Sequence, residues 1–247
     1  MITVTILTKN SGATLRATLQ STREFPEVLL LDTGSTDNTL EIAREFPNVK
    51  IYKENFSGFG PTHNRATALA AHDWILSLDS DEVLTEELIR EILALSLDQN
   101  AVYRILRHNF FNGKHIKWCG GWHPDWIVRL YNRKTTRFTD AAVHEKIITE
   151  GLKIVSLKQY FLHTPYREIG DFLTKMQMYS SLFATQYRSK RSSSLCKALF
   201  HSWAAFLKSY LLKRGFLGGK EGFIISAYNA HTAFYKYLKL DESNQLN

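Results

Sequence analysis

Hydrophobic and polar positions follow two different periods along the first half of the chain. Short apolar runs, typical of strands, are separated by segments in which apolar residues recur as they do on one face of a helix. Strands that alternate with helical patterns predict a parallel sheet with helices on both faces, which is an α/β fold. The strand-like segments are residues 2–8, 27–32, 50–54 and 74–79, and the segments between them are 16–23, 38–46, 63–72 and 85–96.

Two of the strand-like runs, residues 28–32 and 74–79, are mostly apolar and then end in an acid. Such runs are typical of strands that are buried on both faces of a sheet. In parallel sheets of this kind, ligands bind beyond the carboxyl ends of the strands. We therefore expect Thr8, Asp32 and Asp79 to lie together at a ligand-binding edge.

The pattern changes after residue 100. Residues 101–148 contain short aromatic and basic segments joined by a loop rich in glycine and tryptophan, which indicates hairpin-like strands added to the sheet. After Tyr166 the chain becomes helical, and the glycines between residues 215 and 222 mark a turn between two helices. The expected organisation is a domain at residues 1–166, with parts 1–98 and 99–166, and a helical extension at 167–247.

The composition is that of an ordinary globular protein, with 247 residues of which 44% are apolar. Cys119 and Cys196 lack paired spacing, so a reducing compartment is expected. Cys119 and His123 lie four apart without further clustered ligands, so no zinc site is predicted. The first residues do not resemble a signal peptide, and no uncharged apolar run is long enough to span a membrane. These features favour the cytoplasm.

The formal net charge of +7 is located in the C-terminal part of the chain. Residues 1–185 contain 21 basic and 21 acidic side chains, whereas residues 186–247 contain 10 basic and 3 acidic ones. This distribution predicts an acidic partner for the C-terminal segment alone. Two apolar stripes at helical spacing fit either a seam packed on the catalytic part or a surface that meets an anionic membrane. The stripes are Leu195, Leu199, Trp203, Phe206 and Tyr210, and Phe223, Ala227, Ala230, Phe234 and Tyr237.

The first acidic loop, DTGSTDNT, follows the second strand-like run. Gly34 permits a tight turn, and Ser35 or Thr36 can cap the following helix. The loop is therefore either a capped turn or a site at which Asp32 and Thr33 offer polar atoms to a base or ribose. The choice between these readings depends on a partner motif.

The partner motif is Asp79-Ser80-Asp81, just past the run at residues 74–79. Two carboxylates at this spacing can share a hard divalent cation, which takes oxygen ligands and neutralises a diphosphate. The alternative is a capped loop before the helix that begins near Thr85. The position of the motif after an apolar strand, with a first acidic loop upstream, favours the metal site.

These segments resemble the inverting family 2 glycosyltransferases, which have the GT-A nucleotide-sugar-binding fold. The resemblance covers nearly the whole chain, and ILTKN, LDTGSTDNT and LSLDSDE match the nucleotide loops and the D-x-D metal motif. GWHPDWIVRLYNR, FTDAAVHEKI and the segment from FLKSYLLKRG to YKYLKL are similar to the branch that adds a glucose-like sugar to heptose in the lipopolysaccharide inner core. The resemblance implies a UDP-sugar donor, a glycolipid acceptor such as lipopolysaccharide core, and a divalent cation, Mg²⁺ or Mn²⁺.

The same resemblance assigns the donor site. It implies that Thr8, Asp32 and Thr33 meet the uridine, although some relatives have an acid in place of Thr33. It also implies that Asp79 approaches the ribose or the metal and that Asp81 ligates the metal below the diphosphate.

A glycine-containing loop, GFGPTHN, precedes Asn64, which the resemblance places in the nucleotide-sugar site. Close relatives tend to carry Lys or Arg where this chain has Pro61, Thr62 and His63. The chain is therefore expected to lack a cation that binds phosphate at this loop.

An inverting transfer is a single in-line displacement at the anomeric carbon, so a carboxylate must take the proton of the acceptor hydroxyl. In the family this acid lies downstream of the D-x-D motif, and the resemblance implies Glu145 of VHEK. Asp140 and Asp125 are the reserve candidates. A salt bridge from Glu145 to Arg129 or Lys146 is the alternative interpretation.

Residues near the proposed base are candidates for contact with the acceptor or the leaving group. Trp118, Trp122 and Trp126 lie in a polar, glycine-bearing loop and fit either sugar stacking or core packing. Trp122 and His123 are the candidates chosen from this loop. His144 could orient the base or bind the leaving group, and a structural histidine is the alternative.

Other classes of protein explain the pattern less well. A sugar nucleotidyltransferase should have a Gly-rich loop with Arg or Lys after the first strand, and a dehydrogenase should have G-x-G-x-x-G there; LTKNSGATL has neither. A basic nucleic-acid-binding module fits the C-terminal charge but leaves both acidic loops unexplained. We therefore expect no nucleic acid partner, and we expect a cytoplasmic enzyme whose C-terminal segment docks on the inner face of the membrane.

Overall fold

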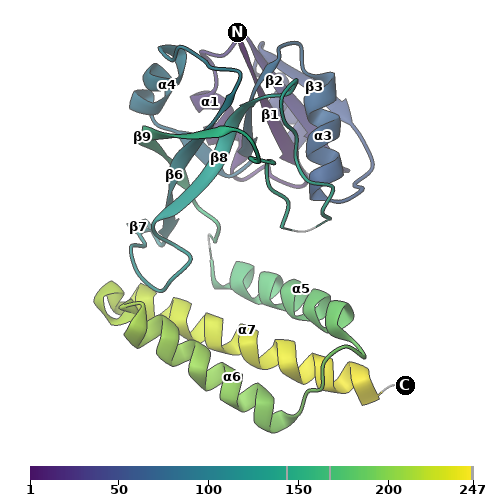
Figure 1. Ribbon diagram of the computed structural model, residues 1–247, viewed down its shortest axis with the longest axis vertical. Coiled ribbons are helices and arrows are strands. Elements are labelled where there is room, and N and C mark those ends of the chain that lie inside the picture. The colour runs from purple at the N-terminus through teal and green to yellow at the C-terminus, as the bar shows by residue number, and fades with distance from the viewer. Residues whose placement is uncertain (143, 167, 246–247) are drawn as a thin grey trace. The chain divides into compact units, whose positions relative to one another are not determined.

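The computed structural model describes residues 1–142, 144–166 and 168–245. It divides into two compact units (Figure 1), the first formed by Met1–Arg107 with Asp125–His163 and the second by His108–Pro124 with Thr164–Asn247. This division differs from the one expected after residue 166, because residues 108–124 group with the C-terminal helices.

The first unit is built on a mixed sheet. Its strands are β1 (Ile2–Thr8), β2 (Glu27–Asp32), β3 (Val49–Lys53), β4 (Trp74–Asp79), β5 (Glu82–Leu84), β6 (Ala101–Phe111), β8 (Asp125–Asn132) and β9 (Lys153–His163). The strand order is β3-β2-β1-β4-β8-β6-β9-β5. The pairs β1/β2, β1/β4 and β2/β3 are parallel, whereas β8 pairs antiparallel with β4 and β6. The predicted parallel half, extended by hairpin-like strands, is confirmed.

Helices cover both faces of this sheet. They are α1 (Leu15–Ser21), α2 (Thr39–Arg44), α3 (Phe59–Leu69) and α4 (Glu86–Leu93). One core cluster contains apolar residues of α1, α2 and α4 together with Val28 and Leu30, whereas the other contains α3 residues together with Leu29 and Leu31. Successive side chains of β2 therefore enter opposite cores, which explains why this strand is apolar along its length.

Helix α3 begins earlier than the sequence pattern predicts, within the glycine-containing loop. Its first amides are paired with backbone: Phe59 N donates to Ala142 O at 3.1 Å, and Gly60 N donates to Ala141 O at 3.0 Å. A Cβ atom at position 60 would overlap the carbonyl oxygen of Thr139. Glycine therefore allows the helix to approach the 139–142 segment closely.

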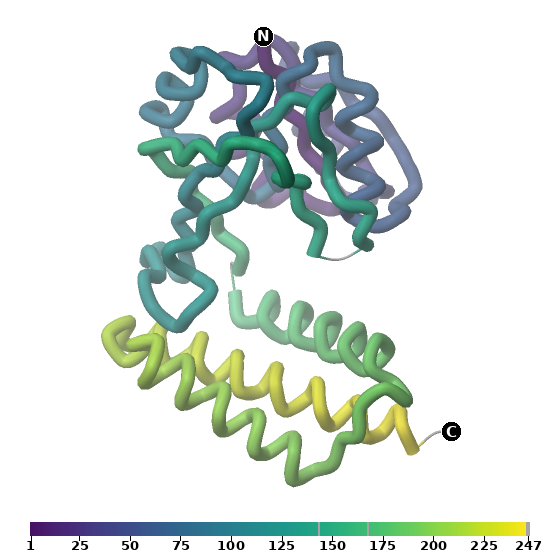
Figure 2. The backbone as a smooth tube through the Cα atoms, in the orientation of Figure 1, coloured from purple at the N-terminus to yellow at the C-terminus, as the bar shows by residue number. Residues whose placement is uncertain are grey.

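The second unit is largely helical. It contains β7 (Lys114–His115), α5 (Ile169–Tyr187), α6 (Leu195–Leu207), a π-helical turn η1 (Lys208–Leu212), a 3₁₀ turn η2 (Gly215–Gly218) and α7 (Gly219–Gln245). Figure 2 shows α5, α6 and α7 side by side, and α7 packs against both of the others. No helix in the described ranges is long and apolar enough to cross a membrane.

Residues 108–124 belong to this unit because they supply half of its apolar core. Phe111 and Trp122 pack in one cluster with Phe172 of α5 and Ile225 of α7. The Phe111 and Phe172 rings meet edge to face with centroids 4.9 Å apart. The hairpin formed by the end of β6 and β7 is thereby fastened to the helices.

Candidate active site

The carboxyl ends of the first strands bring the expected polar residues to one edge. Thr8 pairs in register with Asp32, and its neighbour Leu7 pairs with Asp79. The three residues therefore lie at neighbouring strand ends, as expected, and their contact with a ligand stays a prediction. Thr8 is buried, and its Oγ1 has no hydrogen-bond partner among the described residues. An unpaired buried hydroxyl at the ligand edge is suited to a polar group of a bound molecule.

The loop after β2 is held by Asp32 itself. The buried Asp32 carboxylate accepts hydrogen bonds from Gly34 N and Ser35 N, at 3.2 and 3.1 Å. Gly34 has φ +101°, a conformation that favours glycine. The predicted helix cap is wrong, because Ser35 Oγ accepts from Asn10 N instead and the N-cap of α2 is Asn38.

The second acidic loop is paired with a histidine that the sequence analysis did not identify. Asp81 Oδ2 lies 3.5 Å from Nε2 of His163, the last residue of β9. Glu82 and His163 are partners in the β5/β9 ladder, which explains how a distant residue reaches this loop. A carboxylate and an imidazole are both ligands for divalent metals.

The side chain of Asp79 is held in place by a buried arginine. Arg129 Nη2 of β8 lies 2.6 Å from Asp79 Oδ2 and also binds Glu82, whose side chain is fully buried. Arg107 of β6 adds contacts to Glu82 at 3.2 Å and to Asp125 at 2.8 Å. The result is a connected network of two arginines and three acids behind the D-x-D motif.

This network sets the charge state of the site. Burial disfavours the Asp79 carboxylate, but the neighbouring Arg129 outweighs it and lowers the pKa of Asp79 well below the usual range. Burial likewise opposes the charge of Arg129, yet Asp79 and Glu82 raise its pKa. Asp79 and Arg129 are therefore both ionised at neutral pH.

Glu145 lines a cavity of about 460 Å³ in the first unit. Asp79, Arg107 and Arg129 border the same cavity. Burial raises the pKa of the Glu145 carboxyl, and the negative charge of Asp79 adds to the effect. Among the described residues Arg129 pairs with Asp79 and Glu82, and Glu145 forms no salt bridge with it or with Lys146. The salt-bridge interpretation of Glu145 is therefore wrong.

The two reserve candidates are occupied by arginines. Asp140 is exposed and forms two contacts with Arg137, at 2.6 and 3.0 Å. The hydrogen bonds from Arg137 lower the pKa of Asp140, which makes it a weaker base. Asp125 is paired with Arg107.

Residues of α3 serve the fold. Asn64 donates to Phe138 O and accepts from Phe138 N, both at 3.0 Å, so its amide is used on backbone. His63 is buried and stacks on the Phe138 ring, with centroids 4.3 Å apart. Burial lowers the pKa of His63 to about 4. His63 is therefore neutral at pH 7 and does not replace a phosphate-binding cation.

The remaining candidates are dispersed. Trp122 and His123 belong to the second unit, in whose core the buried Trp122 lies 5.7 Å from the Tyr166 ring. Trp126 lines the Glu145 cavity, and the guanidinium of Arg104 lies over its ring. His144 is exposed, with φ +61°.

Comparison with known proteins identifies the family. Residues 3–152, more than half of the chain, match the model described as glycosyl transferase family 2. The chain belongs to this family. An uncharacterised glycosyltransferase of Rickettsia felis is 28% identical to it over 98% of this chain and 90% of that protein. The lipopolysaccharide core biosynthesis glycosyltransferase LpsC of Rhizobium meliloti is 26% identical over 98% and 92% of the two chains.

A solved structure shares the fold of this glycosyltransferase. The mannosyltransferase PcManGT from Pyrobaculum calidifontis, in complex with GDP-Man and Mn²⁺, matches with a TM-score of 0.53 and 15% identity over 95% of this chain and 86% of that one. The expected α/β GT-A fold is confirmed, and the protein is an enzyme of the glycosyltransferase class.

Proposed function

We propose that this glycosyltransferase is an inverting hexosyltransferase that moves a hexose, glucose by our assignment, from a UDP-sugar to a glycolipid such as lipopolysaccharide core heptose. The position of Glu145 carries the proposal. The pKa of its carboxyl is raised, it forms no ion pair among the described residues, and it lines a cavity that Asp79 also borders. These are the properties of a general base beside a nucleotide-sugar site.

In the proposed reaction, the Glu145 carboxylate takes the proton of the acceptor hydroxyl as the oxygen attacks the anomeric carbon. The raised pKa of Glu145 makes its carboxylate a stronger base toward that proton. Arg129 keeps Asp79 ionised, and Arg129 and Arg107 together hold Asp79 and Glu82 in place, so the edge that receives the nucleotide is rigid before the donor arrives.

The residues around Asp81 fit a divalent cation. Asp81 and His163 offer an oxygen and a nitrogen ligand, and diphosphate oxygens would complete the set. The imidazole favours Mn²⁺ over Mg²⁺, because Mg²⁺ prefers oxygen ligands. When bound, the cation would neutralise the charge that develops on the departing diphosphate. Two other groups of the protein could also neutralise the diphosphate, but neither is able to. His63 is neutral, and the first amides of α3 already donate to backbone carbonyls.

For the nucleoside we assign Thr8, Asp32 and Thr33. Thr8 Oγ1 is available for the uracil, and Thr33 Oγ1 donates to Thr8 O at 3.2 Å, which positions both residues. Asp32 is fixed by the amides of its own loop. Asn64 and Asp140 act indirectly in this proposal, by holding the 137–140 segment.

The acceptor assignment is supported by the similarity to LpsC, whose name places it in lipopolysaccharide core biosynthesis. We further propose that the second unit docks on the anionic cytoplasmic face of a membrane, where such an acceptor would be presented. The apolar side chains of Phe200 and Trp203 on α6 are 62% and 61% exposed, and Leu212 of η1 is 77% exposed. Exposed apolar residues next to lysines and arginines are typical of helices that lie in a membrane interface.

The segment after α6 contains both exposed apolar and exposed basic side chains. From the end of η1 into η2, the sequence Leu-Leu-Lys-Arg-Gly-Phe-Leu at residues 211–217 exposes every residue except Gly215. Of the first predicted stripe, Leu195, Leu199 and Trp203 are more than half exposed. Phe206 and Tyr210 instead stack on each other, with centroids 5.3 Å apart. The part of the stripe that is available to lipid is therefore the stretch from Leu195 to Trp203 of α6.

A ligand screen tests the enzymatic proposal. Thermal unfolding of the full chain is followed with UDP, UDP-glucose, UDP-N-acetylglucosamine, GDP-mannose and CDP, each with and without Mn²⁺. A ligand that binds only the folded state raises the unfolding temperature. We expect the largest rise with UDP-glucose and Mn²⁺, and transfer to a heptose-containing acceptor in the same buffer. A response to GDP-mannose or CDP but not to the uridine ligands would contradict the donor assignment.

A further inference from the structure

Three histidines of the second unit form a cluster outside the proposed active site. His108 is on β6, His115 is on β7, and His123 is in the loop before β8. Each side chain is half-buried, and one ring nitrogen from each lies within 4.8 Å of one from each of the others. In the described part of the chain this is the one group of three or more metal-binding side chains at such distances.

The β6/β7 hairpin brings the first two rings together. Asn112 and Gly113 have φ of 51° and 72°, as in a tight two-residue turn. His115 is paired with Phe110, so His108 lies two residues along the same face of the hairpin. The His108 and His115 rings stack with centroids 4.1 Å apart.

The third ring is brought in by a fixed loop. Asn109 Nδ2 donates to the carbonyl oxygen of Trp122 at 2.8 Å, which holds the residue next to His123 on the hairpin. The His123 ring lies 5.4 Å from His115 and 5.9 Å from His108, centroid to centroid, and is steeply inclined to both. Inclined rings can direct their nitrogens toward one point.

Two nitrogens of the cluster are unsatisfied. His115 Nε2 and His123 Nδ1 are inaccessible to solvent and have no hydrogen-bond partner within the described residues. A buried ring nitrogen without a partner is unfavourable, and a metal ion would satisfy both atoms at once.

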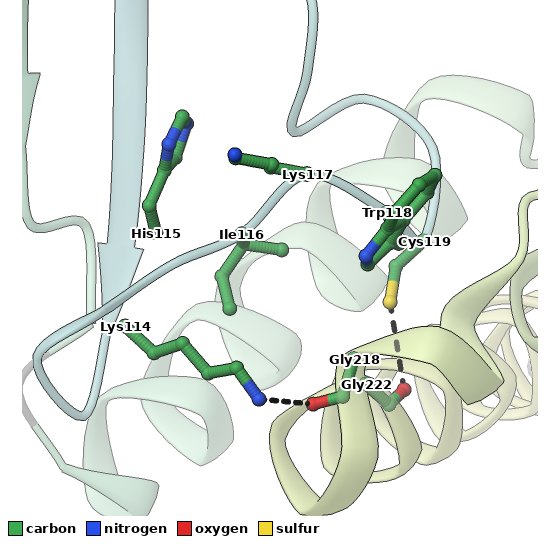
Figure 3. A pocket seen from close by; sticks show the side chains of 8 residues that line it. All are labelled: Lys114, His115, Ile116, Lys117, Trp118, Cys119, Gly218 and Gly222. Atoms are coloured by element: carbon green, nitrogen blue, oxygen red, sulfur yellow. Dashed lines mark hydrogen bonds between the residues drawn. The ribbon is translucent and has the colours of Figure 1, made fainter.

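A cavity of about 350 Å³ borders one member of the cluster, His115 (Figure 3). His115 and Lys117 line it together with Cys119, whose thiol donates a hydrogen bond to Gly222 O. Figure 3 shows the ammonium group of Lys117 pointing toward the His115 ring. This charge opposes a cation in the cluster, so a bound ion would favour an anion as its remaining ligand.

We propose that His108, His115 and His123 bind a transition-metal ion, Zn²⁺ being the commonest ion held by three imidazoles, with the fourth position open to water or an anion. The all-nitrogen ligand set distinguishes this site from the oxygen-containing pair Asp81 and His163. Bound metal would clip the loop before β8 to the hairpin. The proposal does not depend on the proposed glycosyl transfer.

Zinc titration of the full chain, without a histidine tag and after chelator treatment, tests the site. Calorimetry should show one tight Zn²⁺ site per chain, and Co²⁺ at the same site should give the visible absorption of a tetrahedral ion. His115→Gln and His123→Gln should each abolish the tight site, and Lys117→Gln should tighten it. Asp81→Asn and the exposed α7 variant His231→Gln should retain it.

Two results would overturn the site: no tight Zn²⁺ binding by the unmodified chain, or binding that persists in both His115→Gln and His123→Gln. Circular dichroism of the metal-free variants checks their folding. If the histidine variants do not fold, the Lys117→Gln variant tests the site instead. Removal of the ammonium group beside a bound cation should raise the Zn²⁺ affinity, so an unchanged or weaker affinity in this folded variant would contradict the site.

Discussion

Arg129 Nη2 lies 2.6 Å from Oδ2 of Asp79, and the same nitrogen also binds the fully buried carboxylate of Glu82. One guanidinium thus links the end of the central strand β4 to the short strand β5. The D-x-D loop runs between these two strands. Its shape therefore depends on an arginine 50 residues away in the sequence.

Arg129→Gln should destabilise the first unit strongly. The change leaves Glu82 buried without its main partner, and removal of one member of a buried ion pair costs about 3–5 kcal/mol. Denaturant unfolding measures the loss. The matched control is Arg137→Gln, which breaks an exposed pair and should change stability little. Adding Glu82→Gln to Arg129→Gln should recover part of the loss, and an additive double variant would contradict the role given to Glu82.

Asp81→Asn should remove Mn²⁺-dependent UDP binding while the fold stays intact, because the side chain lies in a partly exposed loop. His163→Gln should weaken the same binding, since the two residues face each other. Isothermal titration of UDP with and without Mn²⁺ is the measurement, and Glu87→Gln on the exposed side of α4 is the control. Unchanged affinity in Asp81→Asn would refute the metal assignment.

Glu145→Gln should lower turnover by about 10²-fold or more, the usual contribution of a positioned base, with near-normal donor affinity. Asp140→Asn is the matched control and should retain most activity. In the unmodified enzyme, kcat/KM should fall as the pH falls through the pKa of Glu145, which burial places above the ordinary glutamate value of about 4.3. A severely slowed Asp140→Asn beside an active Glu145→Gln would reverse the assignment.

His63 should make the protein less stable in mild acid. Its pKa is lowered to about 4 in the folded chain, against about 6.5 in an unfolded chain. Between these values the unfolded chain binds the extra proton, so the free energy of unfolding falls as the pH falls, by about 3 kcal/mol over the window. His63→Leu should flatten this dependence and exposed His231→Gln should not, as denaturant titrations at several pH values would reveal. If the free energy of unfolding falls equally steeply with pH in His63→Leu, other groups cause the effect.

Anionic vesicles should co-sediment with the full chain at low salt and release it as salt is raised. Lysines and arginines near an anionic surface contribute about 1 kcal/mol each, so the triple change of Lys208, Lys213 and Arg214 to Gln should weaken binding clearly. Phe200→Ser should also weaken it by removing an apolar contact. Phe56→Ser, an exposed phenylalanine of the first unit, is the control. Equal binding by all these proteins would exclude the proposed docking surface.

The sequence pattern predicted the parallel half of the sheet because strand and helix periods are local. The buried strands β2 and β4 and their terminal acids follow from that pattern. It could not reveal His163 or Arg129, because both reach the D-x-D loop through strand pairings formed by distant segments. His108 and His115 were missed for a related reason: seven residues apart, they meet only because a hairpin turns between them.

Local signals also misassigned two details. Ser35 has the chemistry of a helix cap, but Asp32 already binds its amide and the helix begins later. The start of α3 was placed too late because Gly58 and Gly60 read as loop residues, whereas packing against the 139–142 segment supports an earlier helical turn.

At Gly60 the backbone of α3 passes so close to the Thr139 carbonyl that the methyl group of an alanine at this position would push the two apart. At this point the 139–142 segment thus rests directly on the helix backbone. Larger residues at this position should displace the 139–142 segment, and with it the proposed base Glu145, while leaving every proposed catalytic group chemically intact. A random-mutagenesis screen for inactive enzyme would therefore recover position 60 alongside the acids, although it carries no functional group.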